Sequence, residues 1–378
     1  MGVSTVSAIP VPVLDPSPQP PAELLAALRA GQDILCLSHI GPDGDAVGSV
    51  LGMGWLLRAL GKTPTLALQD AVPHEHTVLP GADTILTSSH ADFRERVKKH
   101  AFDLIVVLDA SSSDRMGNVY NAPVHDAARL VIIDHHVTNT RFGAVNWVAP
   151  ECAATCEMLV YLAEAAGVPL AGPLAECLLT GMVTDTLGFR TTNTTPAVMG
   201  AAMQLMAGGA NLAEIAQRTV NRRPLSQLKV WAAVLPAFEI QEGVIWANVS
   251  REHLKAAGHT NGDLDLSSFL ITVDDADMSA AFTEKLDEKG VTQIDCSFRA
   301  KPDFDVAQVA LAFGGGGHPL ASGCKIAGSL DEVSKRVVAA LQEARRVQNP
   351  TPVSPTTPAD TSQNGDSQTT DSQAAKAG

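Results

Sequence analysis

Two patterns of apolar and polar residues alternate along the first half of the chain. Short, nearly unbroken apolar runs, such as 104–108 and 130–133, are typical of strands that are buried on both faces of a parallel sheet. Between them lie longer segments with apolar residues at helical spacing, the first over residues 22–30. Four strands are predicted, at about 34–38, 64–68, 103–109 and 129–133. Strands that alternate with helices predict a mainly parallel sheet with helices on both faces.

The pattern changes after residue 151, where helical segments follow one another. Helices are predicted at about 151–166, 172–184, 196–207 and 211–219. A second alternating region predicts strands at 235–240, 244–249, 278–285 and 292–299, and helices near 263–271, 305–313 and 329–346. The expected fold class is α/β with two domains: a Rossmann-like domain with a mainly parallel sheet and a smaller α/β domain, with a cleft between them. The expected boundaries are a flexible leader at 1–20, a first domain at 21–207, a connection at 208–228, a second domain at 229–346 and a disordered tail at 347–378.

Acidic and imidazole side chains follow directly on three of the apolar runs, and another acidic residue closes a predicted helix. The first run leads into a turn where Gly44 is expected to adopt dihedral angles that other residues avoid, before a helix begins near Ala46. Because active sites of open α/β sheets form at the carboxyl ends of the strands, these side chains are candidates for one site. They are His39, Asp43, Asp45, Asp109, Asp134, His135, His136 and Asp185.

The chemistry of this set is that of a metal site. Carboxylates and imidazoles without a thiolate favour Mn²⁺ or Mg²⁺, with Fe²⁺ or Co²⁺ as further candidates, whereas thiolates would have indicated Zn²⁺. So many carboxylates at one edge would repel one another unless cations lay between them. Two ions about 3.5–4 Å apart clamp a phosphoryl group, and the set is too large for one ion. Each cluster alone has a simpler interpretation, such as a helix N-cap at a strand-end Asp or a weak Ca²⁺ turn at 43–45. The ordered combination is what favours the metal site.

A second candidate site lies far along the chain, where residues 314–317 are all glycine and precede His318. Backbone N–H groups of successive glycines can approach an anion closely, and the histidine can donate to a phosphate. A flexible linker is the alternative, but the predicted helix before the glycines and the apolar segment 324–326 after them favour an ordered loop. Arg299, at the end of a predicted strand, is either a bidentate phosphate ligand of the same pocket or an ordinary surface residue.

Together these motifs resemble a known family. The segments His39-x3-Asp43-Gly44-Asp45, Asp109, Asp134-His135-His136 and Asp185 are similar to the four motifs of the DHH phosphoesterase superfamily. Residues 314–323 resemble the GGGH motif of the DHHA1 domain, which accompanies one branch of that superfamily. The order and size of the segments resemble the nanoRNase/pAp-phosphatase (NrnA-type) subgroup over about residues 20–345.

The resemblance implies a role for each residue of the set. One Mn²⁺ would be bound by His39, Asp43 and Asp109, and a second by Asp45, Asp109, His135 and Asp185, with Mg²⁺ or Co²⁺ as alternatives. Asp109 would bridge the two ions, His136 would lie beside the substrate phosphate, and Asp134 would orient a neighbouring imidazole. The implied substrate-binding residues are Arg299, Gly315, Gly316, Gly317, His318 and Ser322.

The activity that the resemblance implies is hydrolysis of very short RNA or DNA oligonucleotides, including dinucleotides such as pApA, to mononucleotides. Removal of the 3′-phosphate of pAp to give AMP would accompany it. One alternative is turnover of pApA or cyclic di-AMP as second messengers. Others are a RecJ-like exonuclease on single-stranded DNA, a manganese pyrophosphatase, and a non-catalytic nucleotide-binding module. The last is disfavoured because no motif ligand is missing.

The amino-acid composition limits which kinds of partner the protein can bind and which cellular compartment suits it. The 41 acidic residues outnumber the 27 basic ones, and aromatic residues make up 4%, which argues against a surface that holds long duplexes or long single strands. The six cysteines form no CxxC pair and are interpreted as small core residues of a reducing, cytoplasmic protein. No apolar run approaches the roughly 18 residues of a membrane span, and residues 1–21 lack the basic residues of a signal peptide. Short nucleic acids are thus the expected partners, and no membrane partner is expected. The sequence leaves both a monomer and a homodimer as candidates for the oligomeric state.

Overall fold

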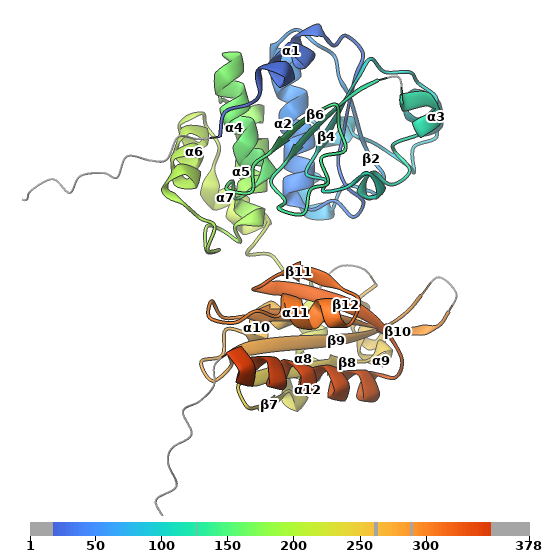
Figure 1. Cartoon of the computed structure of the whole chain (residues 1–378), viewed down its shortest axis with the longest axis vertical. Coiled ribbons are helices and arrows are strands. Elements are labelled where there is room, and N and C mark those ends of the chain that lie inside the picture. The colour runs from blue at the N-terminus through green and yellow to red at the C-terminus, as the bar shows by residue number, and fades with distance from the viewer. Residues whose placement is uncertain (1–17, 127, 261–263, 288–289, 349–378) are drawn as a thin grey trace, which may run out of the picture. The chain divides into compact units, whose positions relative to one another are not determined.

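The computed structural model describes residues 18–126, 128–260, 264–287 and 290–348. The chain divides into two compact units, Met1–Arg222 and Arg223–Gly378 (Figure 1). Most of the predicted leader at 1–20 and tail at 347–378 lies outside the described residues. No helix among the described residues combines the length and the apolarity that a membrane crossing requires.

The first unit is built on a sheet of six parallel strands in the order β3-β2-β1-β4-β5-β6. The strands are β1 Ile34–Leu37, β2 Thr65–Leu68, β3 Leu86–Thr87, β4 Leu104–Leu108, β5 Arg129–Asp134 and β6 Val145–Val148. The four predicted strands are confirmed, whereas the short β3 and β6 were not predicted. Strand order reverses between β1 and β4, where Cys36 lies opposite Val106. In open α/β sheets the carboxyl edge at such a reversal is where ligands bind.

Long helices cover one face of this sheet. They are α1 Ala22–Ala30, α2 Gly44–Ala59, α4 Thr155–Ala166 and α5 Pro173–Asp185, with α6 Pro196–Ala207 and α7 Leu212–Arg218 packed against them. The opposite face is covered by α3 Ala122–His125, the helical turn Arg94–Lys98 and loops, which form a smaller core around Phe93 and Val97. Helices on both faces were expected. The second face is instead covered mostly by short segments.

Helix α2 approaches α5 closely because glycines line its contact surface. A Cβ atom at Gly44 would lie 2.3 Å from Oγ1 of Thr184, and one at Gly48 would lie 2.7 Å from the carbonyl oxygen of Cys177. Gly44 was expected to be needed for unusual dihedral angles, and this expectation is wrong. Gly44 is the first residue of α2 and has no positive φ. It is needed because there is no room for a side chain, and the close approach brings the ends of α2 and α5 together.

The second unit is a mixed sheet in the order β11-β12-β10-β9-β8-β7. Its strands are β7 Glu239–Gln241, β8 Val244–Val249, β9 Met278–Leu286, β10 Thr292–Ala300, β11 Gly316–His318 and β12 Ala321–Ala327. Only β8 and β9 are parallel, and the other neighbours are antiparallel. The strand predicted at 235–240 begins only at Glu239, since residues 235–237 form a helical turn. The predicted loop at 314–317 is partly wrong, because Gly316 and Gly317 form the edge strand β11.

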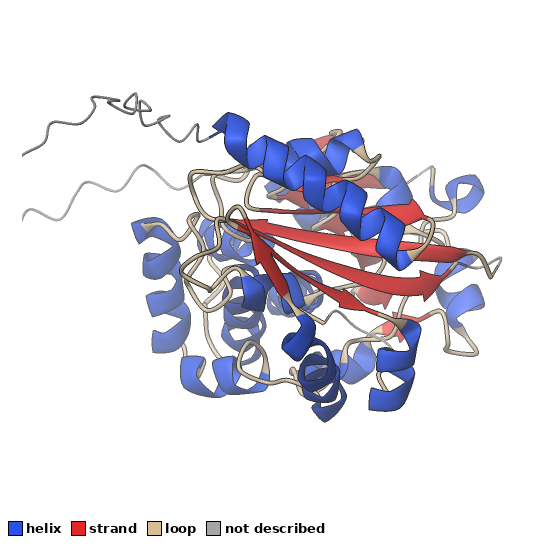
Figure 2. Cartoon of the chain, turned by 90° about the horizontal axis from the view of Figure 1, so that it is seen from below, coloured by secondary structure: helices blue, strands red, loops and turns tan. Residues whose placement is uncertain are grey.

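Helices cover one face of the second sheet fully and the other face partly. On the first face, α11 Ala307–Ala312 and α12 Leu330–Gln348 pack on alternate residues such as Cys296 and Phe298, and α12 is the long helix in front in Figure 2. On the second face, α8 Leu225–Val234, α9 Arg251–Ala257 and α10 Leu266–Leu270 pack on β8 and β9. The expected connection 208–228 therefore includes α7 of the first unit and the start of α8 of the second.

Candidate metal centre

The carboxyl edge of the first sheet brings the predicted ligands together. Residues after β1, β4 and β5 meet the end of α5, and three groups arise whose ligand atoms lie within 4.8 Å of one another. The groups are His39 with Asp43 and Asp109; Asp45 with His135 and Asp185; and Asp109 with His135 and His136. Six of the residues in these groups are the ones that the sequence assigned to two ions. Strand order explains the gathering, since β1, β4 and β5 are consecutive neighbours in the sheet.

Asp109 lies at the centre of these groups. Its Oδ2 atom is 3.5 Å from Nε2 of His39, and its Oδ1 atom is 3.6 Å from Nε2 of His135. The two oxygens of one carboxylate thus face two different ligand groups. The residue has a φ of 56°, a left-handed conformation that costs a non-glycine residue about 1–3 kcal/mol. Such strain is concentrated at functional sites, and here it turns the side chain of a strand-end residue back over the sheet edge.

Hydrogen bonds to carbonyl groups orient the two imidazoles. Nδ1 of His39 lies 2.9 Å from the carbonyl oxygen of Ile40, and Nδ1 of His135 lies 3.4 Å from that of Cys152. An Nδ1–H that donates to a carbonyl leaves Nε2 as the ring atom that can bind a metal. In both residues Nε2 is the atom that faces the carboxylates.

His136 is held differently from the other two histidines. Its Nδ1 atom is 2.7 Å from Oδ1 of Asp134, and Nδ2 of Asn139 donates to Oδ2 of Asp134 at 2.6 Å. The Nδ1 atom that would complete the third group is therefore engaged with Asp134, and we do not assign His136 as a metal ligand. Asp134 is fully buried, so its position depends on these two partners. Burial lowers the pKa of His136, but the hydrogen bond to Asp134 and the charges of Asp109 and Asp134 together outweigh it, and the net shift is upward.

Burial and the crowding of carboxylates together shift the pKa values of the site. Burial, and then the charge of Asp109, raises the pKa of Asp45 well above its usual range, and burial with the charge of Asp45 does the same for Asp185. Burial alone would lower the pKa of His39, but the carboxylates of Asp109 and Asp43 raise it to about 10. Both effects show an excess of negative charge. Oxygen and imidazole donors around such an excess fit a divalent cation such as Mn²⁺ or Mg²⁺.

One of the carboxylates, that of Asp43, also has a structural role. Oδ1 of Asp43 accepts hydrogen bonds from the backbone N–H groups of Asp45 and Ala46, so the residue is the N-cap of α2. The simpler interpretation of a strand-end Asp as a helix cap therefore holds for Asp43 and does not exclude metal binding. Its side chain remains 59% exposed and lies 3.8 Å from Nε2 of His39.

The first turn of α4 makes contacts that sequence reasoning missed. The backbone N–H groups of Thr155 and Cys156 donate to the two oxygens of Asp45, at 2.6 and 2.9 Å. The Thr155 hydroxyl donates to Oδ1 of Asp109 at 3.1 Å. An N-terminal helical turn stabilises a carboxylate because its N–H groups lack partners within the helix. The helix had been expected from residue 151, and its actual start at Thr155 is what places these N–H groups beside Asp45.

The predicted substrate-binding residues of the second unit fall on two faces of the sheet. Arg299 on β10 and His318 on β11 both lie opposite Ala321 of β12, so they share one face. Ser322 lies opposite Phe298 and points into the apolar core on the other face. The structure thus places the side chain of Ser322 on the opposite face from those of Arg299 and His318, although Ser322 is the ladder partner of Gly317. The guanidinium of Arg299 donates to the carbonyl oxygen of Phe298 at 2.9 Å.

The glycines of this segment are needed for close packing against β12. A Cβ atom at Gly315 would lie 2.1 Å from the carbonyl oxygen of Gly323, and Gly317 has a φ of 136°. Gly316 lies opposite Gly323 in the ladder and has space around its Cα among the described residues.

A doubly wound parallel sheet with a carboxylate–histidine cluster at its switch point, followed by a mixed-sheet unit, defines a two-domain α/β protein whose first domain carries a cluster fit for a divalent metal. Comparison with known proteins agrees. Residues 33–182 match the model of the DHH family, N-terminal domain. A Thermus thermophilus protein, the bifunctional oligoribonuclease and PAP phosphatase NrnA, is 32% identical over 323 residues, which are 85% of this chain and 92% of that protein. The Bacillus subtilis protein of the same name is 26% identical over 85% of this chain and 97% of its own length.

The fold is similar to that of a solved structure. An exopolyphosphatase-related protein from Bacteroides fragilis superimposes with a TM-score of 0.78 at 24% identity, over 86% of this chain and 96% of that protein. The chain belongs to the DHH family, in the branch of the NrnA proteins.

Proposed function

We propose that this protein is a metal-dependent phosphoesterase that hydrolyses very short oligonucleotides to mononucleotides and removes the 3′-phosphate of pAp. The relatives from T. thermophilus and B. subtilis are named as bifunctional oligoribonucleases and PAP phosphatases, and this chain matches nearly their whole length. An acidic protein of this composition suits a small substrate better than a long one.

The observation that carries the proposal is the position of Asp109 between two ligand groups. One Mn²⁺ would be bound by His39, Asp43 and Asp109. The second would be bound by Asp45, Asp109, His135 and Asp185. Bound divalent ions supply positive charge to the oxygens of the phosphoryl group and activate water for its hydrolysis.

His136 is the candidate for contact with the substrate phosphate. Asp134 holds its ring through Nδ1, and Asn139 in turn donates to Asp134, so Nε2–H of His136 remains to donate to a phosphate oxygen or to the leaving oxygen. Its side chain is 32% exposed, whereas Asp134 is fully buried. We assign Asp134 as the residue that positions His136, and Asn139 as the residue that positions Asp134.

In the second unit, Arg299, Gly315, Gly316, Gly317 and His318 are proposed to bind the remaining part of the substrate. Arg299 and His318 share one face of the sheet, and the glycines bring the backbone of β11 close to β12. Ser322 is left out of this set because it faces the core.

The test is a hydrolysis assay on purified protein with Mn²⁺, Mg²⁺ or Co²⁺. The substrates are pAp, pApA, cyclic di-AMP, and RNA and DNA oligomers of graded length. We expect pAp and the shortest oligomers to be cleaved fastest. Asp109→Asn should lower the rate by more than about a hundredfold, because metal ions contribute several kcal/mol to such reactions. Asp92→Asn, which removes an exposed carboxylate paired with Arg96, is the matched control and should be active.

Absence of hydrolysis of pAp and dinucleotides with all three metals would refute the proposal, as would full activity of the Asp109→Asn protein. Faster cleavage of long single-stranded DNA would favour a RecJ-like exonuclease instead. A preference for cyclic di-AMP would favour a role in second-messenger turnover.

A further inference from the structure

Two cysteines of the second unit face each other across neighbouring strands. Cys296 on β10 and Cys324 on β12 are directly opposite in the antiparallel ladder, and both are free thiols. Hydrogen bonding between the two thiol groups raises the pKa of Cys296 and lowers that of Cys324. Burial, by contrast, raises the pKa of the Cys36 thiol in the first unit. Cys324 is thus set apart from an ordinary buried cysteine by its partner.

The phase of the ladder defines the distance between the two residues. The N–H of Ala300 donates to the carbonyl oxygen of the opposite residue Leu320 at 3.1 Å, and the N–H of Gly328 donates to that of Thr292 at 3.4 Å. Counting from either of these pairs along the ladder, every second pair of opposite residues is a hydrogen-bonded pair. Cys296 and Cys324 form one of these. Cα atoms of such pairs are about 5.5 Å apart, within the roughly 4.4–6.8 Å range of disulfides.

A disulfide at this position would be strained. Cβ atoms of directly opposite residues are about 4.5–5.5 Å apart, whereas a disulfide requires about 3.8 Å. The strands would have to close by roughly 1 Å. Strained disulfides form under oxidising conditions and are reduced easily, which is the property of a reversible site rather than of a permanent crosslink.

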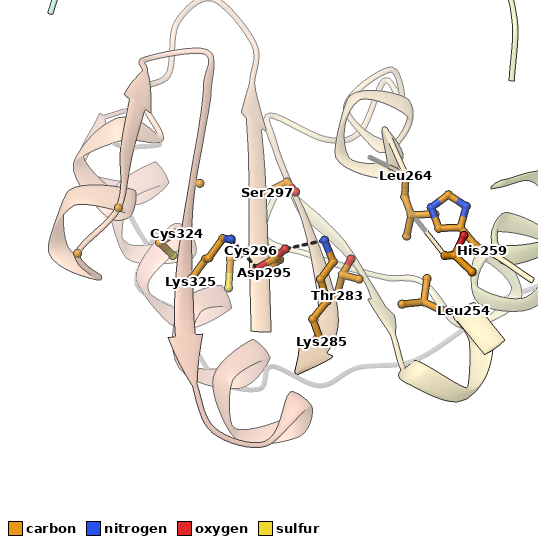
Figure 3. A pocket seen from close by; sticks show the side chains of 14 residues that line it. Leu254, His259, Leu264, Thr283, Lys285, Asp295, Cys296, Ser297, Cys324 and Lys325 are labelled. Carbon is orange, nitrogen blue, oxygen red and sulfur yellow. Dashed lines mark ion pairs between the residues drawn. The ribbon is translucent and has the colours of Figure 1, made fainter. Parts of the chain in front are cut away.

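A pocket lies next to the two cysteines. Both line a pocket of about 850 Å³ in the second unit, and Figure 3 shows them beside the ion pair of Lys285 with Asp295. Lys325 lies on the other side of Asp295, with its Nζ atom 3.9 Å from Oδ1. The side chains of Cys296 and Cys324 turn away from the pocket face, which carries Asp295 and Lys325, toward the apolar core under α11 and α12, and their exposed fractions are only 4% and 7%.

We propose that Cys296 and Cys324 are a reversible thiol–disulfide site that a peroxide oxidises. The Cys324 sulfur attacks one peroxide oxygen, the O–O bond breaks, and hydroxide leaves and takes up a proton to become water. The Cys296 sulfur then attacks the sulfenic sulfur of Cys324, and the S–O bond breaks as the S–S bond forms. The thiol proton of Cys296 joins the departing hydroxide as a second water. Two thiols lose two electrons in total, and one hydrogen peroxide is reduced to two waters.

Closure of the strands would act on the glycine segment. A Cβ atom placed at Gly315 would lie 2.5 Å from Cβ of Cys324, so the backbone at Gly315 rests against this cysteine. Gly316 pairs with Gly323, the neighbour of Cys324 in β12. Movement of β12 toward β10 therefore displaces β11. Weaker substrate binding in the oxidised protein is the expected consequence, and this consequence rests on the proposed function.

The site is tested by mass spectrometry of the full-length protein. After graded hydrogen peroxide, we expect the intact mass to fall by two hydrogen atoms and one linked peptide pair to contain Cys296 and Cys324. A phosphine reductant should restore both thiols. Cys296→Ser and Cys324→Ser should each abolish the linked pair, whereas Cys36→Ala, the control in the first unit, should retain it. Circular dichroism checks that each variant folds, and the wild-type peptide map tests the site even if a variant does not.

Two reduced thiols after oxidation of the wild type would overturn the proposal, as would a disulfide between other cysteines. Activity on pApA is measured on the same samples. A rise in KM that the reductant reverses, and that Cys324→Ser lacks, would support the link to substrate binding. A disulfide without any change in KM would refute that link alone. A disulfide in a protein with no hydrolase activity would refute the proposed function and leave the thiol site intact.

Discussion

Replacement of Thr155 by valine tests whether the first turn of α4 supports the metal centre. Valine has nearly the same shape but lacks the hydroxyl that donates to Oδ1 of Asp109 at 3.1 Å. Thr155 is fully buried and Asp109 is 2% exposed, so water cannot replace the lost bond. The backbone N–H of residue 155 keeps its bond to Asp45, and the perturbation is therefore confined to Asp109.

The expected magnitude follows from the charge of Asp109. A hydrogen bond to a charged group contributes about 1.5–3 kcal/mol, and about 1.4 kcal/mol corresponds to a factor of ten in an equilibrium constant. The Thr155→Val protein should accordingly need about 10–100 times more Mn²⁺ for half-maximal activity, the loss typical of residues that support metal ligands. The assay is the rate of pApA or pAp hydrolysis as a function of Mn²⁺ concentration.

Thr180→Val is the matched control. Thr180 is also buried, but its hydroxyl donates to the carbonyl oxygen of Glu176 within α5, away from the ligands. Its metal dependence should equal that of the wild type. An unchanged Mn²⁺ requirement in the Thr155→Val protein, or an equal loss in both variants, would refute the assigned role of Thr155.

Three further results are expected. Asp185→Asn should raise the Tm of the protein in a chelator by about 2–4 °C per kcal/mol of relieved repulsion. The reason is that burial and the charges of Asp45 and Asp109 disfavour the ionised Asp185 carboxylate. A lower Tm in differential scanning calorimetry would contradict this. Gly48→Ala should lower the free energy of unfolding in urea by about 1–3 kcal/mol, since the new Cβ would lie 2.7 Å from a carbonyl oxygen. Gly200→Ala in α6 is the control: no described atom lies within 4 Å of its new Cβ, so it should be neutral or stabilising. Arg299→Ala should raise the KM for pAp with little effect on kcat, and an unchanged KM in steady-state kinetics would count against its assignment.

Much of the first unit could be predicted because the relevant signals are local. The apolar runs of β1 and β4 are buried along their length and that of β5 is buried from Val131 on, and the polar residue that ends each run marks the carboxyl edge of the sheet. Parallel strands share that edge, so the strand-end positions of His39, Asp109 and His135 were enough to predict that these residues lie together. Helices such as α1 and α6 begin and end where the sequence predicted.

Other elements depend on partners that lie far away in sequence. β3 has only two residues, and β11 is rich in glycine, which has a low intrinsic preference for strands. Both are strands because a neighbouring strand supplies hydrogen-bond partners. Helix α8 begins after Pro224, inside the expected connection 208–228, and continues to Val234. Its burial of Trp231 against β8 and its neighbours is what stabilises it.

The sequence by itself determined the chemistry of the centre: which oxygen and nitrogen ligands are present, and that they follow the strands of a parallel sheet. Only the tertiary structure decided which atoms meet. Asp109 presents one oxygen to His39 and the other to His135, and the Thr155 hydroxyl reaches Asp109 from a helix 46 residues further along the chain. The physical reason is that residue type and periodicity are local properties. A contact, by contrast, depends on strand order, on backbone angles such as the positive φ of Asp109, and on a ladder register in which a shift of one residue turns a side chain to the opposite face.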